Sequence, residues 1–236
     1  GFSGGAKDKA YLLPQIFSAA KQNVTHDGLI ALSGATGGAP GIIVIAGTGS
    51  FCFGRNGSGK TARAGGWGYI YGDEGGGFDL TRQALRAALR AEEGWGPETN
   101  LGPLLLAHTG DKTVNDLLHR FYTPAFTRQQ IAAMSKLVDQ AADQGDQVAE
   151  SILVTAAESL ADFAEAAKGM LFAPREPAVI SYVGGVFKSA RLLKAFVTFT
   201  QATPPVYNPG VGALLEAYRE AGLANIHLSN VPESEK

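Results

Sequence analysis

The sequence has little cysteine and almost no surplus of charge of either sign. Cys52 is the one cysteine in 236 residues, and 20 lysines and arginines stand against 22 aspartates and glutamates. A lone cysteine cannot form a disulfide within the chain or a thiolate cluster for zinc, which is typical of a reducing compartment and predicts a cytoplasmic protein. A formal net charge of -2 gives no basic surface for nucleic acid or for an anionic membrane, so neither partner is expected.

Long apolar runs are missing as well. The longest, residues 41–46 and 179–186, are far shorter than the roughly 20 residues that cross a bilayer. The chain opens on Gly1 rather than methionine and lacks the basic start and apolar core of a signal peptide, so we expect the native start to lie upstream. The composition, 45% hydrophobic and 18% charged, is that of a globular chain with a buried core.

Glycine, in contrast, is abundant, and many of the 31 glycines gather between Gly34 and Gly77. In this region the apolar run 41–46 predicts a buried strand that leads into a Gly-Thr-Gly-Ser turn. The Asn56-Gly57 pair predicts a hairpin that joins strands over 51–55 and 60–64. Residues 57–61 resemble a phosphate-binding loop but lack its first glycine, so we interpret them as part of that hairpin.

The middle of the chain is expected to be helical. Apolar residues recur at helical spacing in four segments, which are residues 79–93, 113–122, 127–144 and 146–171. After them, residues 178–183 predict a second buried strand, and helices are expected over 189–200 and 212–221.

The turn Gly47-Thr48-Gly49-Ser50 has what an anion site needs. Its glycines let backbone N–H groups approach an oxyanion, and its two hydroxyls add donors, so phosphate is the natural ligand. The alternative interpretation is a plain hairpin turn.

Two further glycine-rich segments, residues 65–68 and 72–77, carry an aromatic ring and two carboxylates. Proteins bind sugars with such groups, since a ring stacks on the apolar side of the sugar and carboxylates accept from its hydroxyls. The alternative is that Trp67 fills the core and that Asp73 caps the helix beginning near Phe78.

Asp27 lies between a polar stretch and the small apolar segment 29–35, at an expected strand end or helix start. A carboxylate there could take a proton from a substrate hydroxyl. The alternative is an N-cap aspartate, with His26 as a surface histidine.

Taken in order, Asp27 and residues 47–50, 65–68, 72–75 and 183–189 resemble the BadF/BadG and N-acetylglucosamine kinase family. The likeness runs from about Gly4 to Ala221. It implies an α/β, actin-like ATPase (ribonuclease H-like) fold, with two lobes around a nucleotide cleft.

One element of the family pattern does not precede Gly1, namely an Asp-Gly-Gly-Gly-Thr hairpin. The N-terminal lobe is therefore expected to be incomplete. Residues 1–78 would hold the rest of that lobe and the start of the C-terminal lobe, with the phosphate and sugar loops. Residues 79–236 would form the C-terminal α/β lobe, with its helical middle and adenosine-binding segment.

The resemblance implies ATP-dependent phosphorylation of a hydroxyl of an amino sugar, either N-acetylglucosamine or glucosamine, with Mg²⁺ on the phosphates. Asp27 would be the general base. The residues implied to bind the nucleotide are Gly47, Thr48, Gly49, Ala142, Gly184, Gly185 and Ser189. Those implied to bind the sugar are Ser50, Phe51, Gly66, Trp67, Gly68, Tyr69 and Asp73. Phe51 stands where characterised sugar kinases tend to carry a polar residue, which leaves the exact sugar open.

Two other functions remain open. An ATPase activator of a radical dehydratase or reductase shares this fold, but two subunits would bring only two Cys52 thiolates to an iron–sulfur cluster that normally takes four. A non-catalytic module that binds sugar or nucleotide is the other. Family members often dimerise, so a homodimer is one expectation.

Overall fold

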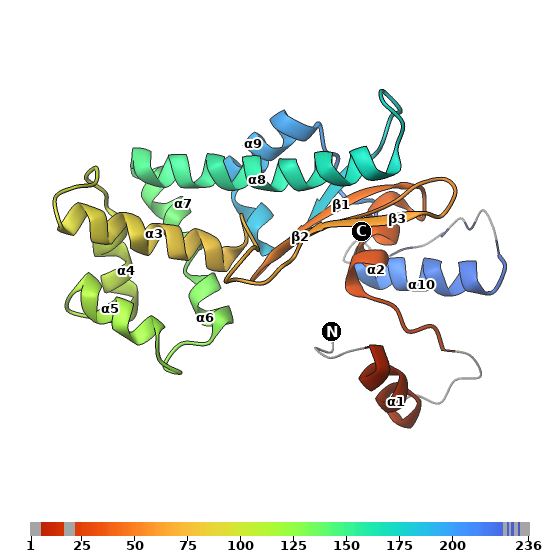
Figure 1. The fold of residues 1–236 in the computed structure, drawn as a ribbon, viewed down its shortest axis with the longest axis horizontal. Coiled ribbons are helices and arrows are strands. Elements are labelled where there is room, and N and C mark those ends of the chain that lie inside the picture. Colours follow the sequence, from red (N-terminus) through yellow and green to blue (C-terminus); the bar gives the residue numbers. More distant parts are fainter. Residues whose placement is uncertain (1–5, 17–21, 224–225, 227, 229–230, 232–236) are drawn as a thin grey trace.

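The computed structural model describes residues 6–16, 22–223, 226, 228 and 231 (Figure 1). The first half of the chain contains α1 (Ala6–Ile16), α2 (Asp27–Thr36), β1 (Gly41–Ala46), β2 (Ser50–Arg55), β3 (Thr61–Gly65), α3 (Gly77–Glu92), α4 (Leu101–Thr109) and α5 (Val114–Phe121). The second half contains α6 (Arg128–Ala133), α7 (Lys136–Asp143), α8 (Gln147–Leu171), β4 (Ile180–Val183), the 3₁₀ turn η1 (Gly185–Lys188), α9 (Ala190–Thr200) and α10 (Pro209–Glu220).

The four strands form one mixed sheet in the order β3-β2-β1-β4. β1 and β2 pair antiparallel from Gly41 opposite Arg55 to Ala46 opposite Ser50, whereas β4 runs parallel to β1. All four strands lie where the sequence predicts them, which confirms the α/β class. The sheet joins strands from both sides of residue 78, and the division of lobes at that residue stays a prediction.

Helices cover both faces of the sheet. α8 crosses one face, where Ile42, Val44 and Cys52 join the main core, and α2 covers the other face, where Ile43 and Phe53 are buried (Figure 1). Because successive side chains of a strand point to opposite faces, a strand covered on both sides must be apolar throughout, as β1 is.

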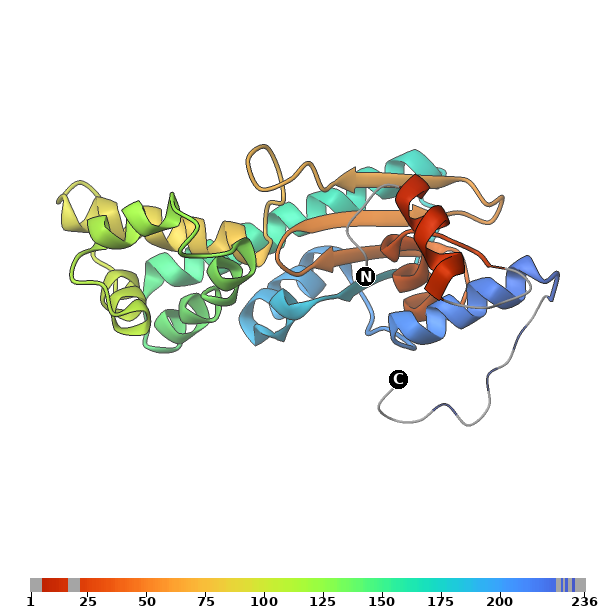
Figure 2. The same ribbon diagram turned by 90° about the horizontal axis from the view of Figure 1, so that it is seen from below.

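Helices α3 to α7 gather beyond one end of the sheet (Figures 1 and 2). The amphipathic helix predicted over 79–93 is confirmed as α3, which turns Leu80, Ala84, Leu85 and Ala88 toward the core. Its arginines lie on the opposite, more exposed side, as the sequence spacing indicates. α3 begins at the edge of the sheet and thereby links the helical group to the strand ends.

The segment 127–144 differs from the single helical stretch that the sequence predicts. It forms two helices, α6 and α7, separated at Met134 and Ser135. The N–H groups there bond three residues back, from Met134 to Ile131 and from Ser135 to Ala132, which tightens the chain into a 3₁₀-like turn. Thr81 of α3 donates to the Ile131 carbonyl (2.8 Å), which holds the end of α6 against α3.

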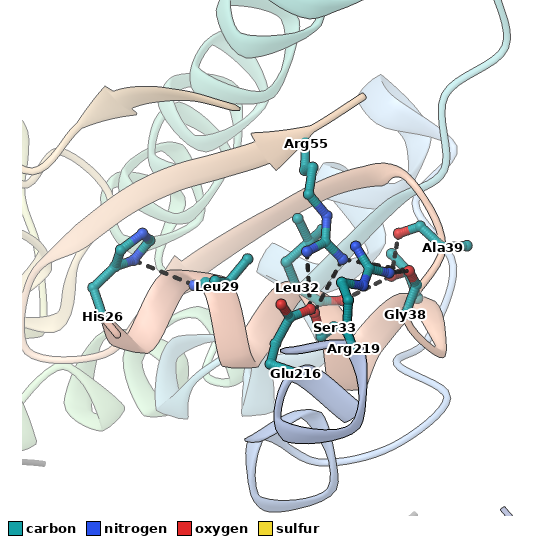
Figure 3. A network of polar contacts seen from close by, with 10 residues as sticks. His26, Leu29, Leu32, Ser33, Gly38, Ala39, Arg55, Glu216 and Arg219 are labelled. Carbon is teal, nitrogen blue, oxygen red and sulfur yellow. Dashed lines mark hydrogen bonds and ion pairs between the residues drawn. The ribbon is translucent and has the colours of Figure 1, made fainter. Parts of the chain in front are cut away.

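α10 packs along α2 and is joined to it by a buried polar network (Figure 3). Arg55 of β2 donates to Glu216 of α10 (2.9 Å), and both side chains bond the Ser33 hydroxyl of α2. Every member is buried and paired, so the two helices and the sheet are fixed in one arrangement. Nothing in the sequence pattern predicted this network, since its members come from three distant segments.

Candidate functional site

The turn between β1 and β2, Gly47–Ser50, is docked on the start of α3 and is called the strand-end turn below. Gly77 N–H donates to the Gly47 carbonyl (2.8 Å), and Phe78 N–H donates to the Thr48 carbonyl (3.0 Å). In the part of the chain that the structure describes, the N–H groups of Thr48 and Gly49 donate to no protein acceptor. Two neighbouring N–H groups are therefore available to an anion at this turn.

Asp73 lies directly against the strand-end turn. A Cβ added to Gly49 would overlap the Asp73 carboxylate, which shows how closely the two residues approach. Asp73 has a left-handed backbone (φ 61°), and its Oδ1 accepts from Gly68 N–H (3.2 Å). Asp73 therefore bridges the strand-end turn and the loop that carries Trp67. The alternative in which it caps the next helix is wrong, because the N-cap of α3 is Gly76.

Residues 72–75, here called the GDEG loop, are fixed from two sides. Ser50 Oγ donates to the Glu74 carbonyl (2.5 Å). Asp79, which is buried in the first turn of α3, accepts from Gly75 N–H (3.1 Å) and from the side chains of Arg82 and Gln83. This role of Asp79 was not predicted from the sequence, although an acidic residue in the first turn of a helix that follows a glycine run is a recognisable signal.

The end of β4 meets the strand-end turn. Val183 pairs with Ile45 in the parallel ladder, so the carboxyl ends of the two strands lie side by side. Gly184 has φ 124°, and a Cβ there would overlap the Ala46 carbonyl, so this close approach requires glycine. Ligands of open α/β sheets bind beyond such strand ends. The predicted nucleotide residues at Gly47–Gly49 and Gly184–Gly185 are thus brought together.

Asp27 begins α2 at the same end of the sheet, on the face that α2 covers. A Cβ on the neighbouring Gly28 would lie 3.1 Å from Phe51 and from Phe53, which shows how closely the helix start approaches β2. The exposed Asp27 carboxylate accepts from Gly28 N–H (2.9 Å). Among the described residues it makes no hydrogen bond to the strand-end turn. The N-cap of α2 is His26, not Asp27.

Residues 66–71, here called the aromatic loop, expose their rings. Trp67 is 79% exposed and Tyr71 is 85% exposed, so the alternative in which Trp67 fills the core is wrong. Tyr69 lies edge-on to Phe78 with 5.1 Å between ring centroids, and the Arg128 guanidinium lies over its other side. The loop starts at Gly66, whose Cβ would crowd Phe51.

A cavity of about 390 Å³ adjoins the Gly184–Gly185 turn. It is lined by Leu80, Ser135, Lys136, Asp139, Asp143, Gly185, Val186, Lys188, Ser189, Ala190 and Arg191. Gly185 and Ser189, both predicted to meet the adenosine part of a nucleotide, thus share one cavity wall. Ala142 is buried in the core on α7, and the same helix presents Asp139 and Asp143 to the cavity instead.

The loop that looks like a phosphate site at residues 57–61 is a hairpin turn, as predicted. Asn56 Oδ1 accepts from the N–H groups of Ser58 (3.1 Å) and Lys60 (3.0 Å). Lys60 Nζ donates to the Met170 carbonyl at the end of α8 (2.9 Å), so its charge is turned away from the strand ends.

Within the described ranges no three His, Cys, Asp or Glu side chains come together in a group that could hold a metal ion. No helix in those ranges combines the length and apolar character needed to span a bilayer.

Two proteins of known activity are similar to this chain in sequence. The N-acetylmuramic acid/N-acetylglucosamine kinase of Clostridium acetobutylicum is 38% identical over 170 residues, which cover 72% of this chain and 56% of that protein. The N-acetyl-D-glucosamine kinase of Dictyostelium discoideum is 34% identical over 170 residues, covering 69% of this chain and 53% of that one. The chain spans about half the length of these two relatives.

A solved structure has the same fold. The crystal structure of a putative N-acetylglucosamine kinase from Chromobacterium violaceum matches with a TM-score of 0.71 and 28% identity over 89% of this chain and 72% of that chain. This confirms the predicted fold class of the actin-like sugar kinases for the part that is shared. The model of the BadF/BadG/BcrA/BcrD ATPase family matches residues 2–217, and the chain belongs to that family.

Proposed function

We propose that this protein transfers the γ-phosphoryl group of ATP to a hydroxyl of an amino sugar of the N-acetylglucosamine type. One observation carries the proposal: a turn with two available N–H groups is docked on the loop that holds Asp73, at the strand ends beside the start of α2. The names of the two relatives, both kinases of N-acetylglucosamine, support the choice of reaction and substrate.

The strand-end turn binds the nucleotide phosphates in this proposal. The N–H groups of Thr48 and Gly49 and the exposed Thr48 hydroxyl are donors for phosphate oxygens. Because the turn is already fixed by its bonds to Gly77 and Phe78, it needs no rearrangement when charge develops on the transferred group.

Asp27 is the general base. As the sugar oxygen attacks the γ-phosphorus, its proton passes to the Asp27 carboxylate, the bond from phosphorus to the β,γ-bridging oxygen breaks, and ADP leaves. Asp27 is exposed, and the neighbouring Gly28 lies close to Phe51 at the start of β2, so an acceptor can reach the carboxylate beside that strand.

The sugar lies between the aromatic loop and Asp73. Trp67 offers a free ring face for the apolar side of a pyranose, and Tyr69 is held nearby by Phe78. Asp73 accepts hydrogen bonds from sugar hydroxyls. The remaining residues of the proposed sugar site are Ser50, Phe51, Gly66 and Gly68. Asp73 contacts both Gly68 of the aromatic loop and Gly49 of the strand-end turn, so the sugar contacts and the phosphate contacts depend on each other.

ATP is the phosphoryl donor, and its adenosine part takes the cavity beside Gly185 and Ser189. Mg²⁺ would arrive on the nucleotide phosphates and neutralise their charge. Within the described residues no three His, Cys, Asp or Glu side chains form a group that could hold a metal ion, so we assign no protein ligand.

The test is Asp27→Asn in the complete protein, assayed for phosphoryl transfer across N-acetylglucosamine, glucosamine and N-acetylmuramic acid. Turnover should fall by about 10² to 10⁴, with sugar affinity unchanged, because a general base acts mainly in the transition state. Asp116→Asn, an exposed aspartate on α5, is the matched control and should retain full activity. Turnover within about twofold of wild type in Asp27→Asn would remove Asp27 from this role.

The activator function receives no support from the position of Cys52. This thiol is fully buried in β2, and burial raises its pKa to about 12. A protonated, buried thiol is a poor ligand for a cluster shared between subunits. A non-catalytic module would bind sugar and nucleotide without any turnover, which the same assay detects.

A further inference from the structure

The Ser189 hydroxyl is fully engaged within the protein. It caps α9 by accepting from Leu192 N–H (3.1 Å), and it donates its one proton to Asp139 Oδ1 of α7. A hydroxyl has a single proton to donate. Ser189 therefore cannot donate to a nucleotide without giving up its bond to Asp139.

Asp139 is the group that Ser189 presents to the cavity. In the residues that the structure describes, Ser189 is its hydrogen-bond donor through Oδ1, and no donor reaches Oδ2. No buried side-chain oxygen in that part of the chain lacks a partner, so Oδ2 is accessible, and Asp139 is one of the residues that line the cavity. One oxygen is thus held in place while the other is available as an acceptor.

Two other charged groups that line this cavity, Asp143 and Arg191, are paired with each other. Asp143, one turn further along α7, pairs with Arg191 (3.2 Å), and Arg191 also binds Glu150 (2.9 Å). Burial raises the pKa of Asp139, although the bond from Ser189 acts in the opposite direction. A half-buried carboxylate of this kind gains from a ligand that donates a hydrogen bond to it.

The ribose of a nucleotide supplies such a donor at the right place. The ribose is bonded directly to the phosphates, so it lies nearer to the Gly184–Gly185 turn than the amine on the far edge of the purine does. Ser189 follows Gly185 by one short 3₁₀ turn. Aspartate and glutamate bind ribose hydroxyls in other α/β nucleotide sites.

We propose that Asp139 accepts a hydrogen bond from a ribose hydroxyl of the nucleotide and thereby selects ribonucleotides, and that Ser189 is the residue that positions it. The inference rests on the proposed function only in placing a nucleotide in this cavity. It adds a specificity residue that the sequence motifs did not indicate, because Asp139 lies in a helix between unrelated core positions.

The experiment measures equilibrium binding of ATP, 2′-deoxy-ATP, 3′-deoxy-ATP and inosine triphosphate to the complete protein by calorimetry, followed by KM and kcat with each. Wild type should prefer ATP over one deoxynucleotide by about tenfold, the scale of one hydrogen bond to a charged group. Asp139→Asn and Asp139→Ala should remove most of that preference by weakening ATP binding, with kcat at saturation nearly unchanged. The ratio of ATP to inosine triphosphate should stay the same.

Matched variants separate the roles. Asp143 lines the same cavity from the same helix, but its side chain is 72% exposed. The variant Asp143→Asn should therefore leave the ribose preference intact. Ser189→Ala should reduce the preference and raise KM, and Ser189→Thr, which keeps the hydroxyl, should restore both. Thermal melting of each variant checks that it is folded.

The outcomes distinguish this inference from the proposed function. Ribose preference that disappears in Asp139→Asn supports the inference even if no sugar is phosphorylated, because binding alone reports it. A wild type without ribose preference, a preference that survives in a folded Asp139→Ala, or a variant that alters only the inosine ratio would overturn it.

Discussion

The strand-end turn and the aromatic loop flank the same end of the sheet but are built in opposite ways. The strand-end turn is closed by hydrogen bonds to Gly77 and Phe78, and the Asp73 carboxylate lies directly against its Gly49. The aromatic loop leaves Trp67 and Tyr71 almost fully exposed. Asp73 contacts both, since it covers Gly49 and accepts from Gly68.

This difference indicates which half of the site is complete before a ligand arrives. A turn that presents N–H groups to an anion works best when it is already fixed, because reorganisation at the moment of reaction is costly. An exposed aromatic ring, in contrast, becomes buried only when a ligand stacks on it. We therefore expect changes in the strand-end turn to affect turnover and changes in the aromatic loop to affect affinity.

The largest effect should come from Gly49→Ala. The new methyl group would overlap the Asp73 carboxylate, so either this side chain, which accepts from Gly68 N–H, or the strand-end turn must shift. A shift of about 1 Å at a reacting centre costs about 10² in kcat/KM, and overpacking costs about 1–3 kcal/mol of stability. Kinase assays and urea unfolding measure the two losses.

Gly57→Ala is the control for this change. Gly57 lies in the β2–β3 turn, where an added Cβ meets no atom within 4 Å. It should retain both activity and stability. If Gly49→Ala behaves like Gly57→Ala, the strand-end turn is not the rigid half of the site.

A smaller effect is expected from Trp67→Ala. Loss of one stacked ring should raise the KM for the sugar about three- to tenfold and leave kcat unchanged. Stability should change by less than about 0.5 kcal/mol, because the ring is exposed. Initial rates over a range of sugar concentrations and a thermal melt provide both numbers.

Trp95→Ala is the matched control, since this ring is 63% exposed and stacks on Arg90 beyond the far end of α3. Its sugar KM should equal that of wild type. A drop in kcat with unchanged KM in Trp67→Ala would contradict the assignment of affinity to the aromatic loop.

The smallest effect on activity should come from a change in α8, the helix that packs on β2 and β3. Asp146 caps α8, and its carboxylate accepts from Val148, Ala149, Asn100 and Thr99. Asp146→Ala should lower the free energy of unfolding by about 1–2 kcal/mol at pH 7 without altering either KM. Asp162→Ala, an exposed position on the same helix, should have no such cost.

The same variant has a pH signature. Burial raises the pKa of Asp146, but the hydrogen bonds from Thr99 and the three backbone N–H groups outweigh it and hold the pKa below its ordinary 3.8. A lowered folded pKa means that the stabilisation is present above pH 3.8 and is lost as pH falls through the folded value. The stability gap between wild type and Asp146→Ala should therefore narrow in acid. A gap that is constant with pH would show that the carboxylate charge contributes nothing.

Much of the fold could be predicted from the sequence because it depends on local patterns. The apolar run 41–46, the Asn56-Gly57 turn and the amphipathic spacing of α3 each specify an element without reference to the rest of the chain. The break between α6 and α7 could not be predicted in this way. It depends on Thr81, which is distant in sequence and holds the Ile131 carbonyl.

The residues of the candidate site also fall into those that a local sequence pattern predicts and those that depend on distant contacts. Glycine motifs marked both strand ends, since glycine is needed where backbones approach closely, as at Gly184. Whether Trp67 was core or surface stayed open, because no sequence pattern reveals what lies opposite a ring. Asp139 and Asp79 were missed, since their significance comes from Ser189 and Gly75 and not from their own neighbours in sequence.

The network of Ser33, Arg55 and Glu216 has a consequence for how the protein is made. Ser33 and Glu216 are 183 positions apart, and Cβ atoms on Gly34 or Gly212 would overlap the backbone of the facing segment. During synthesis, the helix that carries Asp27 leaves the ribosome long before its partner α10 exists. Until residues 209–220 have emerged, Arg55 has no Glu216 to pair with. The helix that carries Asp27, the proposed general base, should therefore remain unanchored until α10 has been translated.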